Sequence, residues 1–366
     1  MEEKTYVNDI DRSIYDIRNE ETDAYRIEEG LKPAIVEQIS KEKNDPLWME
    51  LFRLKSLQIY NSMEVPDWGP SLEGLDMSHI ATYVRPGTKM KTKWSDVPEA
   101  IKDTFERLGI PQAERKSLAG VGAQYDSELV YHNVRQEVAE LGVVYTDLES
   151  ALKGDYADMV KKHFMKLVKP SDHKFAALHG AVWSGGSFVY VPPGVSVEIP
   201  LQSYFRLNAP GAGQFEHTLI IVDEGASLHF IEGCSAPKYN VANLHAGCVE
   251  LYVGRNAKLR YSTIENWSKN MYNLNTKRAQ VEEGGTIEWY QRFMDKHHIT
   301  HVSAAEIESA WEKLQFEYIR NYRPFRQVLM DTFKKTAWHY GFEYDEADVI
   351  SFADEMAKMK AFPDAK

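Results

Sequence analysis

The chain has 366 residues, and its 43 lysines and arginines against 55 aspartates and glutamates give a net charge of −12. This acidic balance argues against a nucleic-acid-binding protein, because such proteins need cations to neutralise phosphates. The sequence has no long apolar run and no basic or apolar signal region at its N-terminus, so we expect no membrane span and no secretory signal.

Residues 1–173 are predicted to form a mainly helical N-terminal region. Apolar residues recur at helical spacing over 33–63, and Pro46 breaks this segment at a place suited to the first turn of a second helix. Further helices are predicted over 95–108 and 126–168, the latter interrupted by a short extended piece at 143–146.

Residues 174–293 are predicted to form a parallel β-helix. Four units of strand, tight turn and strand follow one another, and the turns fall 31, 29 and 30 residues apart, at Gly194, Gly225, Gly254 and Gly284. An even period of this length built from strands is typical of a solenoid, in which each coil buries its apolar face on its neighbours. The alternative is a β-sandwich, which does not need such even intervals.

Residues 294–366 are predicted to form a tail of three helices. Ser303 and Glu306 make a capping-box pattern, and Gly341 marks a helix end. The fold class is therefore mixed α and β, with an N-terminal helical region, a parallel β-helix core and a helical tail.

Several common kinds of site are not indicated. No P-loop motif and no G-x-S-x-G elbow occur, which argues against an ATPase or a serine hydrolase. Acidic residues are scattered along the strands, which argues against a β-helix enzyme that acts on polysaccharides. The side chains of Cys234, Cys248, His245 and His229 lie close in sequence without a C-x-x-C pair, so a permanent zinc site is disfavoured.

The two cysteines are expected to remain reduced, because a chain without an export signal points to the cytoplasm. Cys234 lies in a Gly-Cys-Ser turn at a strand end, where it is either a reactive, accessible thiolate or an inert small residue. Strand alternation places Val249 and its apolar companions inside the coil, Cys248 outside and His245 inside. Arg206 shares its face with Asn208, and an outer-face salt bridge is the commoner role for such an arginine.

Four long runs carry a family resemblance: "WSDVPEAIKDTFERLGIPQAERKSLAGVGAQYDSELVYHN", "KFAALHGAVWSGGSFVYVPPGVSVEIPLQSYFRLN", "GQFEHTLIIVDEGASLHFIEGCSAP" and "YSTIENWSKNMYNLNTKRA". With them the chain resembles SufB, the scaffold subunit of the SUF iron–sulfur cluster assembly system. The resemblance covers residues 45–291, about two thirds of the chain.

The resemblance implies a right-handed parallel β-helix and a scaffold that is not an enzyme. SufB works with SufC, an ATPase, and with the homologous SufD. Sulfur arrives as persulfide from a cysteine desulfurase through a SufE or SufU carrier. The implied cargo is a transient iron–sulfur cluster, and FAD is a further cofactor that the resemblance suggests for the assembled complex.

The resemblance also implies site residues. Cys234, in the family's E-G-C-[ST]-A-P motif, would accept the persulfide, and Glu232 lies two residues before it. The other implied residues, which line a path through the β-helix, are Arg206, Asn208, His245 and Lys277. Cations on such a path would keep a persulfide anionic and nucleophilic. At Glu265 the family commonly has glutamine, so this carboxylate is a departure.

The tail is the larger departure, because the likeness ends near residue 291. SufB ordinarily continues with a second cysteine, a glutamate–histidine pair that holds the nascent cluster, and helices that dock SufC. Neither Cys234 nor Cys248 matches the second cysteine. The alternative prediction is therefore an interaction protein that binds SUF partners without holding a cluster. The tail is a replacement partner domain, an unusual variant or the product of a shifted reading frame, and these alternatives stay open.

Overall fold

The computed structural model describes residues 18–19, 23–67, 71–107, 118–267 and 270–291, with four single residues beyond them, at 330, 333, 334 and 349. Nearly all of these residues belong to one compact unit, Asp9–Trp289. The three helices predicted for the tail therefore lie outside the described residues, apart from those four positions.

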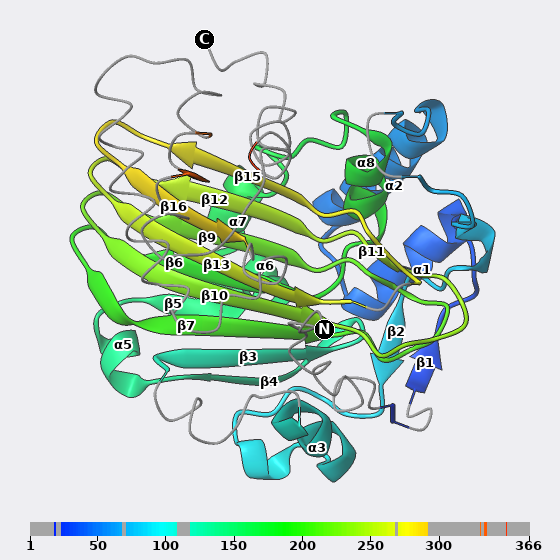
Figure 1. Ribbon diagram of the computed structural model, residues 1–366, viewed down its shortest axis with the longest axis horizontal. Coiled ribbons are helices and arrows are strands. Elements are labelled where there is room, and N and C mark those ends of the chain that lie inside the picture. Colours follow the sequence, from blue (N-terminus) through cyan, green and yellow to red (C-terminus); the bar gives the residue numbers. More distant parts are fainter. Residues whose placement is uncertain are drawn as a thin grey trace, which may run out of the picture. The chain divides into compact units, whose positions relative to one another are not determined.

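A parallel β-helix forms the centre of this unit, as predicted (Figure 1). The first coil consists of β6 (Ser187–Val191), β7 (Ser196–Arg206) and β8 (Gly213–Gln214). The second consists of β9 (His217–Val222), β10 (Ser227–Ser235) and β11 (Asn243–His245), and the third of β12 (Cys248–Val253), β13 (Lys258–Asn266) and β14 (Met271–Asn273). A fourth begins with β15 (Thr276–Val281) and β16 (Thr286–Gln291). Equivalent strands of successive coils pair in parallel, which excludes the sandwich.

The interior of the β-helix is filled by stacked apolar side chains. Leu201, Phe230 and Tyr261 are in register on adjacent strands and are fully buried. Because side chains alternate between the two faces of a strand, every second residue joins this core. Helices cover part of the outer face of the same coils. Strands that are buried on both faces have consecutive hydrophobic residues, as in other buried parallel sheets.

The tight turns use left-handed residues, but one of them is not the predicted glycine. Gly194, Gly225 and Gly284 have φ of 72°, 65° and 68°. In the third turn the left-handed residue is Asn256, with φ 56°, and not Gly254. Asparagine tolerates this conformation better than most residues. Gly254 is needed for a different reason, since a Cβ there would lie 2.9 Å from the backbone nitrogen of the preceding coil's turn.

Part of the region predicted to be helical consists of strands instead. Residues 120–134 form a hairpin of β3 (Gly120–Tyr125) and β4 (Glu128–Val134), and β3 extends the sheet by pairing in parallel with β7. The extended piece predicted at 143–146 is confirmed as β5 (Val144–Asp147), which pairs with β6. The helices that remain are α5 (Gln136–Glu140), α6 (Leu148–Lys153) and α7 (Ala157–His163). Tertiary pairing outweighs local propensity here, because β3 is buried along its whole length.

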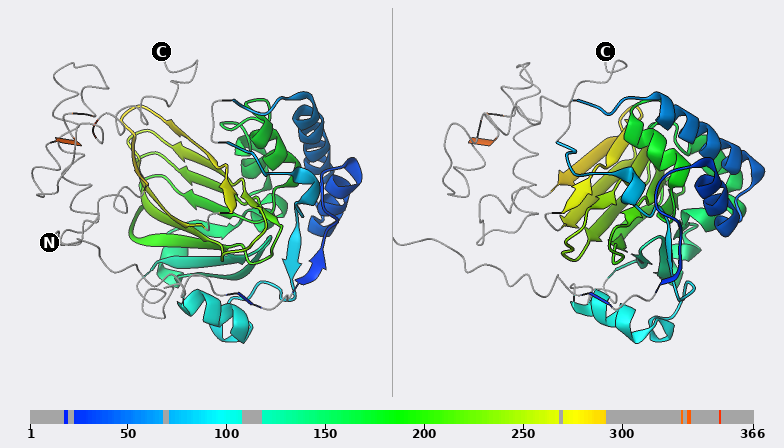
Figure 2. Two further views of the ribbon diagram at one scale, coloured as in Figure 1. Left: turned by 45° about the vertical axis from the view of Figure 1, so that its right-hand side comes forward. Right: turned by 90° about the vertical axis from the view of Figure 1, so that its right-hand side faces the viewer.

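Helices cover one side of the β-helix (Figure 2). They are α1 (Pro33–Lys43), α2 (Leu47–Ser62) and α8 (Lys174–Val182), and α8 occupies the start of the segment predicted to be β-helix. The predicted helix near 95–108 is confirmed as α3 (Glu99–Arg107), and the smaller elements are β1 (Asp23–Arg26), β2 (Val84–Pro86) and the 3-10 helices η2 (Met77–His79) and η3 (Trp94–Asp96). Arg53 ties this layer together, since it pairs with Asp45 at 2.6 Å and donates to the Trp183 carbonyl at 2.8 Å.

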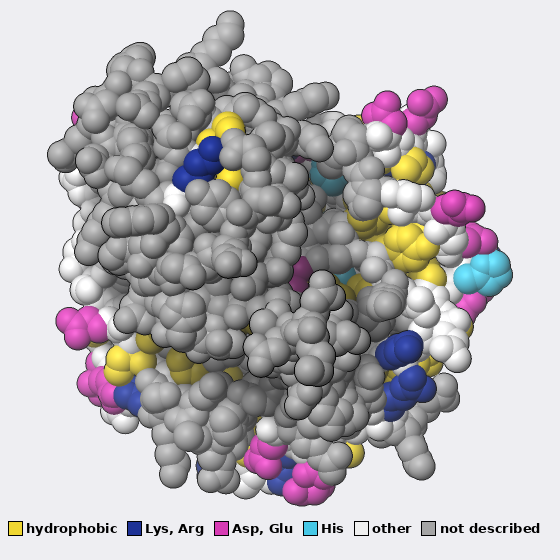
Figure 3. Space-filling view, in the orientation of Figure 1, with side chains coloured by type: hydrophobic (Ala, Val, Ile, Leu, Met, Phe, Trp, Pro, Cys, Tyr) yellow, Lys and Arg dark blue, Asp and Glu magenta, His cyan; other side chains and the backbone are white. Residues whose placement is uncertain are grey.

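The surface of the described residues agrees with the acidic composition. On the face shown in Figure 3, the described lysines and arginines are scattered in small separate groups, some of them beside acidic side chains. No helix in the described ranges has the length and apolar character needed to cross a bilayer.

Gly186 and Gly194 allow a matched test of the β-helix. Both have positive φ, 97° and 72°, but a Cβ at Gly186 would lie 2.1 Å from the His217 carbonyl oxygen, whereas nothing lies within 4 Å of one at Gly194. We expect Gly186→Ala to lower the free energy of unfolding by about 3–5 kcal/mol, because two coils must separate. Gly194→Ala should cost only about 1 kcal/mol for the left-handed backbone. Urea unfolding of the two variants checks this, and equal losses would contradict the described stacking.

Candidate functional site

The apolar interior of the β-helix changes to a polar one toward the ends of β10 and β13. On β10, Leu228 and Phe230 are followed on the same face by Glu232 and Cys234. On β13, the residues in register with Glu232 and Cys234 are Thr263 and Glu265. Across the interior, Thr218 and Lys277 are in register with Val249 of β12. We call the resulting group the Cys234 cluster, which consists of Glu216, Glu232, Cys234, His245, Glu265 and Lys277.

Cys234, His245 and Glu216 form the tightest part of the cluster. One donor atom from each lies within 4.8 Å of the other two, and all three residues are buried. His245 Nε2 lies 2.5 Å from Glu216 Oε1, and His245 Nδ1 lies 2.8 Å from Asn273 Oδ1. The other carboxylate oxygen of Glu216, Oε2, is buried without a hydrogen-bond partner among the described residues. An unpartnered buried carboxylate oxygen is costly, so it marks a position prepared for a proton or a ligand.

The proton on His245 Nδ1 follows from its neighbours. Asn273 donates its Nδ2 to Glu265, which leaves its Oδ1 to accept from His245 Nδ1–H. Burial would lower the pKa of His245, but the Glu216 and Glu265 carboxylates and the hydrogen bonds to Glu216 and Asn273 together raise it. His245 and Glu216 therefore share a proton between Nε2 and Oε1, as a buried imidazolium–carboxylate pair.

Lys277 is the second cation, and two carboxylates share it. Its Nζ donates to Glu265 Oε1 at 3.2 Å and to Thr263 Oγ1 at 3.1 Å. Burial would lower the pKa of Lys277, but Glu232 and Glu265 raise it. Glu232 accepts hydrogen bonds of 2.7 Å from Thr218 and from Tyr261, while burial raises its own pKa.

Cys234 is a neutral thiol in this environment. Its residue is 1% exposed, and burial raises the pKa of the thiol well above its ordinary value. The three carboxylates of the cluster raise the pKa further, and Lys277 opposes them. Of the two alternatives for Cys234, an accessible thiolate therefore does not match the structure, although the expected cations are present. A base inside the cluster is needed to form the thiolate, and one carboxylate oxygen of Glu216 lies within 4.8 Å of the Cys234 sulfur.

Four of the six residues predicted for the site converge, and two do not. Glu232, Cys234, His245 and Lys277 belong to the Cys234 cluster. Arg206 is in register with Ser235, the residue after Cys234, and donates to its hydroxyl at 3.0 Å. Strand alternation places this pair on the opposite face of the sheet.

Asn208 lies just beyond the end of β7, and its backbone nitrogen donates to Asp126 Oδ1 at 2.6 Å. Arg206 and Asn208 are both buried, and burial lowers the pKa of Arg206.

The sequence did not indicate Glu216. It lies in the short connection between β8 and β9, where a single carboxylate forms no motif, and only closure of the coil brings it to His245. Gly247 is the residue whose identity reflects this contact, since a Cβ at position 247 would lie 2.3 Å from Glu216 Oε1. Glu265, noted as a departure from the family, lies in register with Cys234 and binds Lys277.

Cys248 lies on the outer face of the sheet, as strand alternation predicted. It packs with Trp183, Phe164 and other apolar residues beneath α8. Both cysteines are free, which confirms that they do not form a disulfide.

Comparison with known proteins identifies related sequences. The family model described as "SufBD protein N-terminal region" matches residues 37–203, and the model described as "SUF system FeS cluster assembly, SufBD core domain" matches residues 205–319. The second match continues beyond residue 291, where the resemblance was expected to end.

The chain is 50% identical to the iron-sulfur cluster assembly protein SufB of Bacillus subtilis (strain 168) over 281 residues, which are 77% of this chain and 60% of the relative. It is also 50% identical to an iron-sulfur cluster assembly SufBD family protein of Staphylococcus aureus (strain MRSA252) over 275 residues, 75% of this chain and 59% of the relative. The chain thus spans about three fifths of the length of these relatives.

Proposed function

Because this chain belongs to the SufB/SufD family, we propose that it takes part in iron–sulfur cluster assembly as a scaffold that accepts persulfide sulfur at Cys234. The observation that supports the acceptor role is the Cys234 cluster itself. A thiol, two cations and three carboxylates are enclosed in the interior of a β-helix whose remaining core is apolar.

The proposed sulfur transfer needs no outside oxidant. The Cys234 thiolate attacks the outer sulfur of a carrier's persulfide, the S–S bond of that persulfide breaks, and the carrier's cysteine leaves as a thiolate. A new S–S bond then joins the transferred sulfur to Cys234, so that one persulfide is exchanged for another. The proton that Cys234 loses passes to Glu216, whose Oε2 is unpartnered among the described residues.

Charge balance favours keeping this proton inside the cluster. A persulfide anion added to three carboxylates would place more negative charges in the cluster than its two cations, Lys277 and His245, can balance. If Glu216 takes the proton, the net charge of the cluster is the same before and after loading. This matters because the cluster is buried, where each uncompensated charge costs several kcal/mol.

The partners and cargo follow from the family and extend the proposal. We propose a transient iron–sulfur cluster as cargo, with SufC and SufD as complex partners and a cysteine desulfurase with SufE or SufU as the sulfur source. The sulfur, nitrogen and oxygen donors of Cys234, His245 and Glu216 suit iron. The scaffold would work in the cytoplasm without turnover of its own, and FAD remains an expectation of the resemblance alone.

The alternative is a protein that binds SUF partners without handling sulfur. One observation favours it: Cys234 is almost fully buried, and its carboxylate neighbours oppose the thiolate. The two functions differ in whether the chain acquires sulfur when a complete sulfur source is supplied.

The test is anaerobic incubation of the full chain with a cysteine desulfurase, its SufE or SufU carrier and cysteine. After the partners are removed, the proposal expects sulfur on the chain that dithiothreitol releases as sulfide, and a sample without desulfurase serves as control. Sulfur at the level of this control would support the interaction protein and overturn the scaffold.

A further inference from the structure

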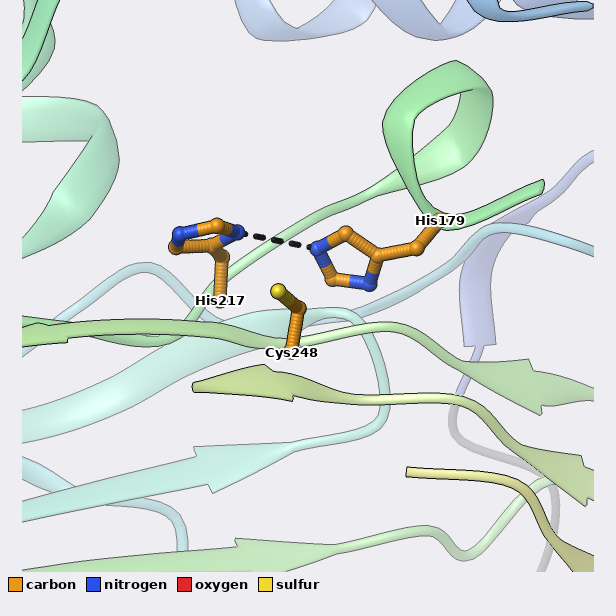
Figure 4. Close-up of side chains that lie close together, drawn as sticks. All are labelled: His179, His217 and Cys248. Carbon is orange, nitrogen blue, oxygen red and sulfur yellow. Dashed lines mark hydrogen bonds between the residues drawn. The ribbon is translucent and has the colours of Figure 1, made fainter. Parts of the chain in front are cut away.

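A second group of donor atoms lies on the outer face of the sheet, away from the Cys234 cluster. His179 from α8, His217 from β9 and Cys248 from β12 each place one donor atom within 4.8 Å of the other two. All three residues are at most 2% exposed. In Figure 4 the two imidazoles face each other and the Cys248 sulfur points toward the space between them.

The ring nitrogens that face away from this space have the partners that orient metal-binding histidines. His179 Nδ1 lies 2.8 Å from the Ala246 carbonyl oxygen, and His217 Nε2 lies 3.1 Å from Glu250 Oε2. A carbonyl and a carboxylate in these positions fix the tautomer and the ring orientation of a ligating histidine. The convergent atoms are therefore the remaining nitrogens, His179 Nε2 and His217 Nδ1, which lie 3.0 Å apart.

Glu250 is held as a carboxylate. Its two oxygens accept hydrogen bonds from the backbone nitrogens of Met165, Leu167 and Val168, at 2.5, 2.6 and 2.9 Å. Both of its oxygens therefore already act as hydrogen-bond acceptors. Glu250 therefore accepts from His217 and does not donate to it.

We propose that His179, His217 and Cys248 bind a divalent transition metal ion, with Zn²⁺ as the best match. Two imidazole nitrogens and one cysteine sulfur are donors that zinc prefers in proteins. Two imidazoles and a thiolate also exclude Ca²⁺ and Mg²⁺, which prefer oxygen ligands.

The two facing nitrogens need only a small adjustment. Two nitrogens bound to one tetrahedral zinc ion lie about 3.4 Å apart, so the histidines must separate by a few tenths of an ångström from their hydrogen-bonded distance. The bound ion would join α8 to the second and third coils. Such a site fastens the helical layer to the β-helix and is independent of sulfur transfer at Cys234.

Cobalt is the probe, because Co²⁺ enters zinc sites and gives a thiolate-to-cobalt charge-transfer band. The experiment uses the full chain with Cys234→Ser, so that Cys248 is the remaining thiol. We expect about one ion per chain with this band, and loss of the band in the Cys234→Ser/Cys248→Ser chain, with far-ultraviolet circular dichroism as the folding control. Absence of the band from the first chain, or its presence in the second, would overturn the proposal.

Discussion

We expect Cys234→Ala to abolish transfer of persulfide sulfur to this chain. The sulfur atom at Cys234 is the proposed attacking group, and no other donor in the Cys234 cluster can form an S–S bond. The other cysteine, Cys248, lies on the opposite face of the sheet beneath α8 and cannot take over. The measurement is labelling of the chain by sulfur from labelled cysteine, after incubation with desulfurase and carrier and separation without reductant.

Cys248→Ala is the matched control. Cys248 is as buried as Cys234 and burial raises its pKa as well, so the two substitutions remove the same group from equally buried positions. The Cys248→Ala chain should label as the unchanged chain does. Undiminished labelling of the Cys234→Ala chain would refute the acceptor assignment.

The second large effect is expected for Lys277→Met. This change leaves Glu232 and Glu265 without their shared cation. The Lys277 side chain is only 9% exposed, so water cannot replace the lost charge. Removing one partner of a buried ion pair costs about 3–5 kcal/mol of unfolding free energy, because the other charge remains buried and uncompensated. Adding Glu265→Gln to Lys277→Met should recover part of this loss, since one carboxylate is then neutral.

The unfolding free energy lost in the Lys277→Met chain should depend on pH in a defined direction. In the unchanged chain the pKa of Glu265 is below its ordinary value of 4.5, although burial opposes this, because Lys277 and His245 favour the carboxylate. Its contribution to stability is then present above pH 4.5 and is lost as the pH falls. Without Lys277 the pKa of Glu265 should rise above 4.5. The Glu265 carboxylate then destabilises the folded chain above pH 4.5 instead of stabilising it. The destabilisation should therefore be largest near neutral pH and shrink toward pH 4.5.

Urea unfolding at neutral and at acidic pH checks this prediction. Lys258→Met is the control, because Lys258 also pairs with a glutamate, Glu288, but its side chain is 59% exposed. An exposed pair of this kind contributes about 0–1 kcal/mol. If Lys277→Met is no more destabilising than Lys258→Met, the Cys234 cluster does not have the charge balance described here.

The β-helix was predictable from the sequence, because a repeated coil leaves a period that can be read directly. The details that failed depend on single residues. In the third turn the residue with a left-handed backbone is Asn256 and not a glycine. The alignment of glycines therefore placed this turn at Gly254, two residues too early. Residues 128–134, which form β4, were taken as helix because they pair with β3, which in turn pairs with β7, a strand far along the chain.

The candidate site was predictable only in part. Strand alternation placed His245 inside the coil and Cys248 outside it, while the resemblance supplied Cys234 and Lys277. The same resemblance grouped Arg206 with them, although its register with Ser235 places it on the other face. Glu216 could not be foreseen, because a lone carboxylate acquires its role only when the coil closes on His245.

Mass spectrometry of peptides from the chain after sulfur transfer tests the acceptor position most directly. The account predicts that the peptide with Cys234 becomes heavier by one sulfur atom and that dithiothreitol reverses the change, while the peptide with Cys248 keeps its mass. A sulfur found on Cys248, or on neither peptide while the carrier is loaded, would contradict the account.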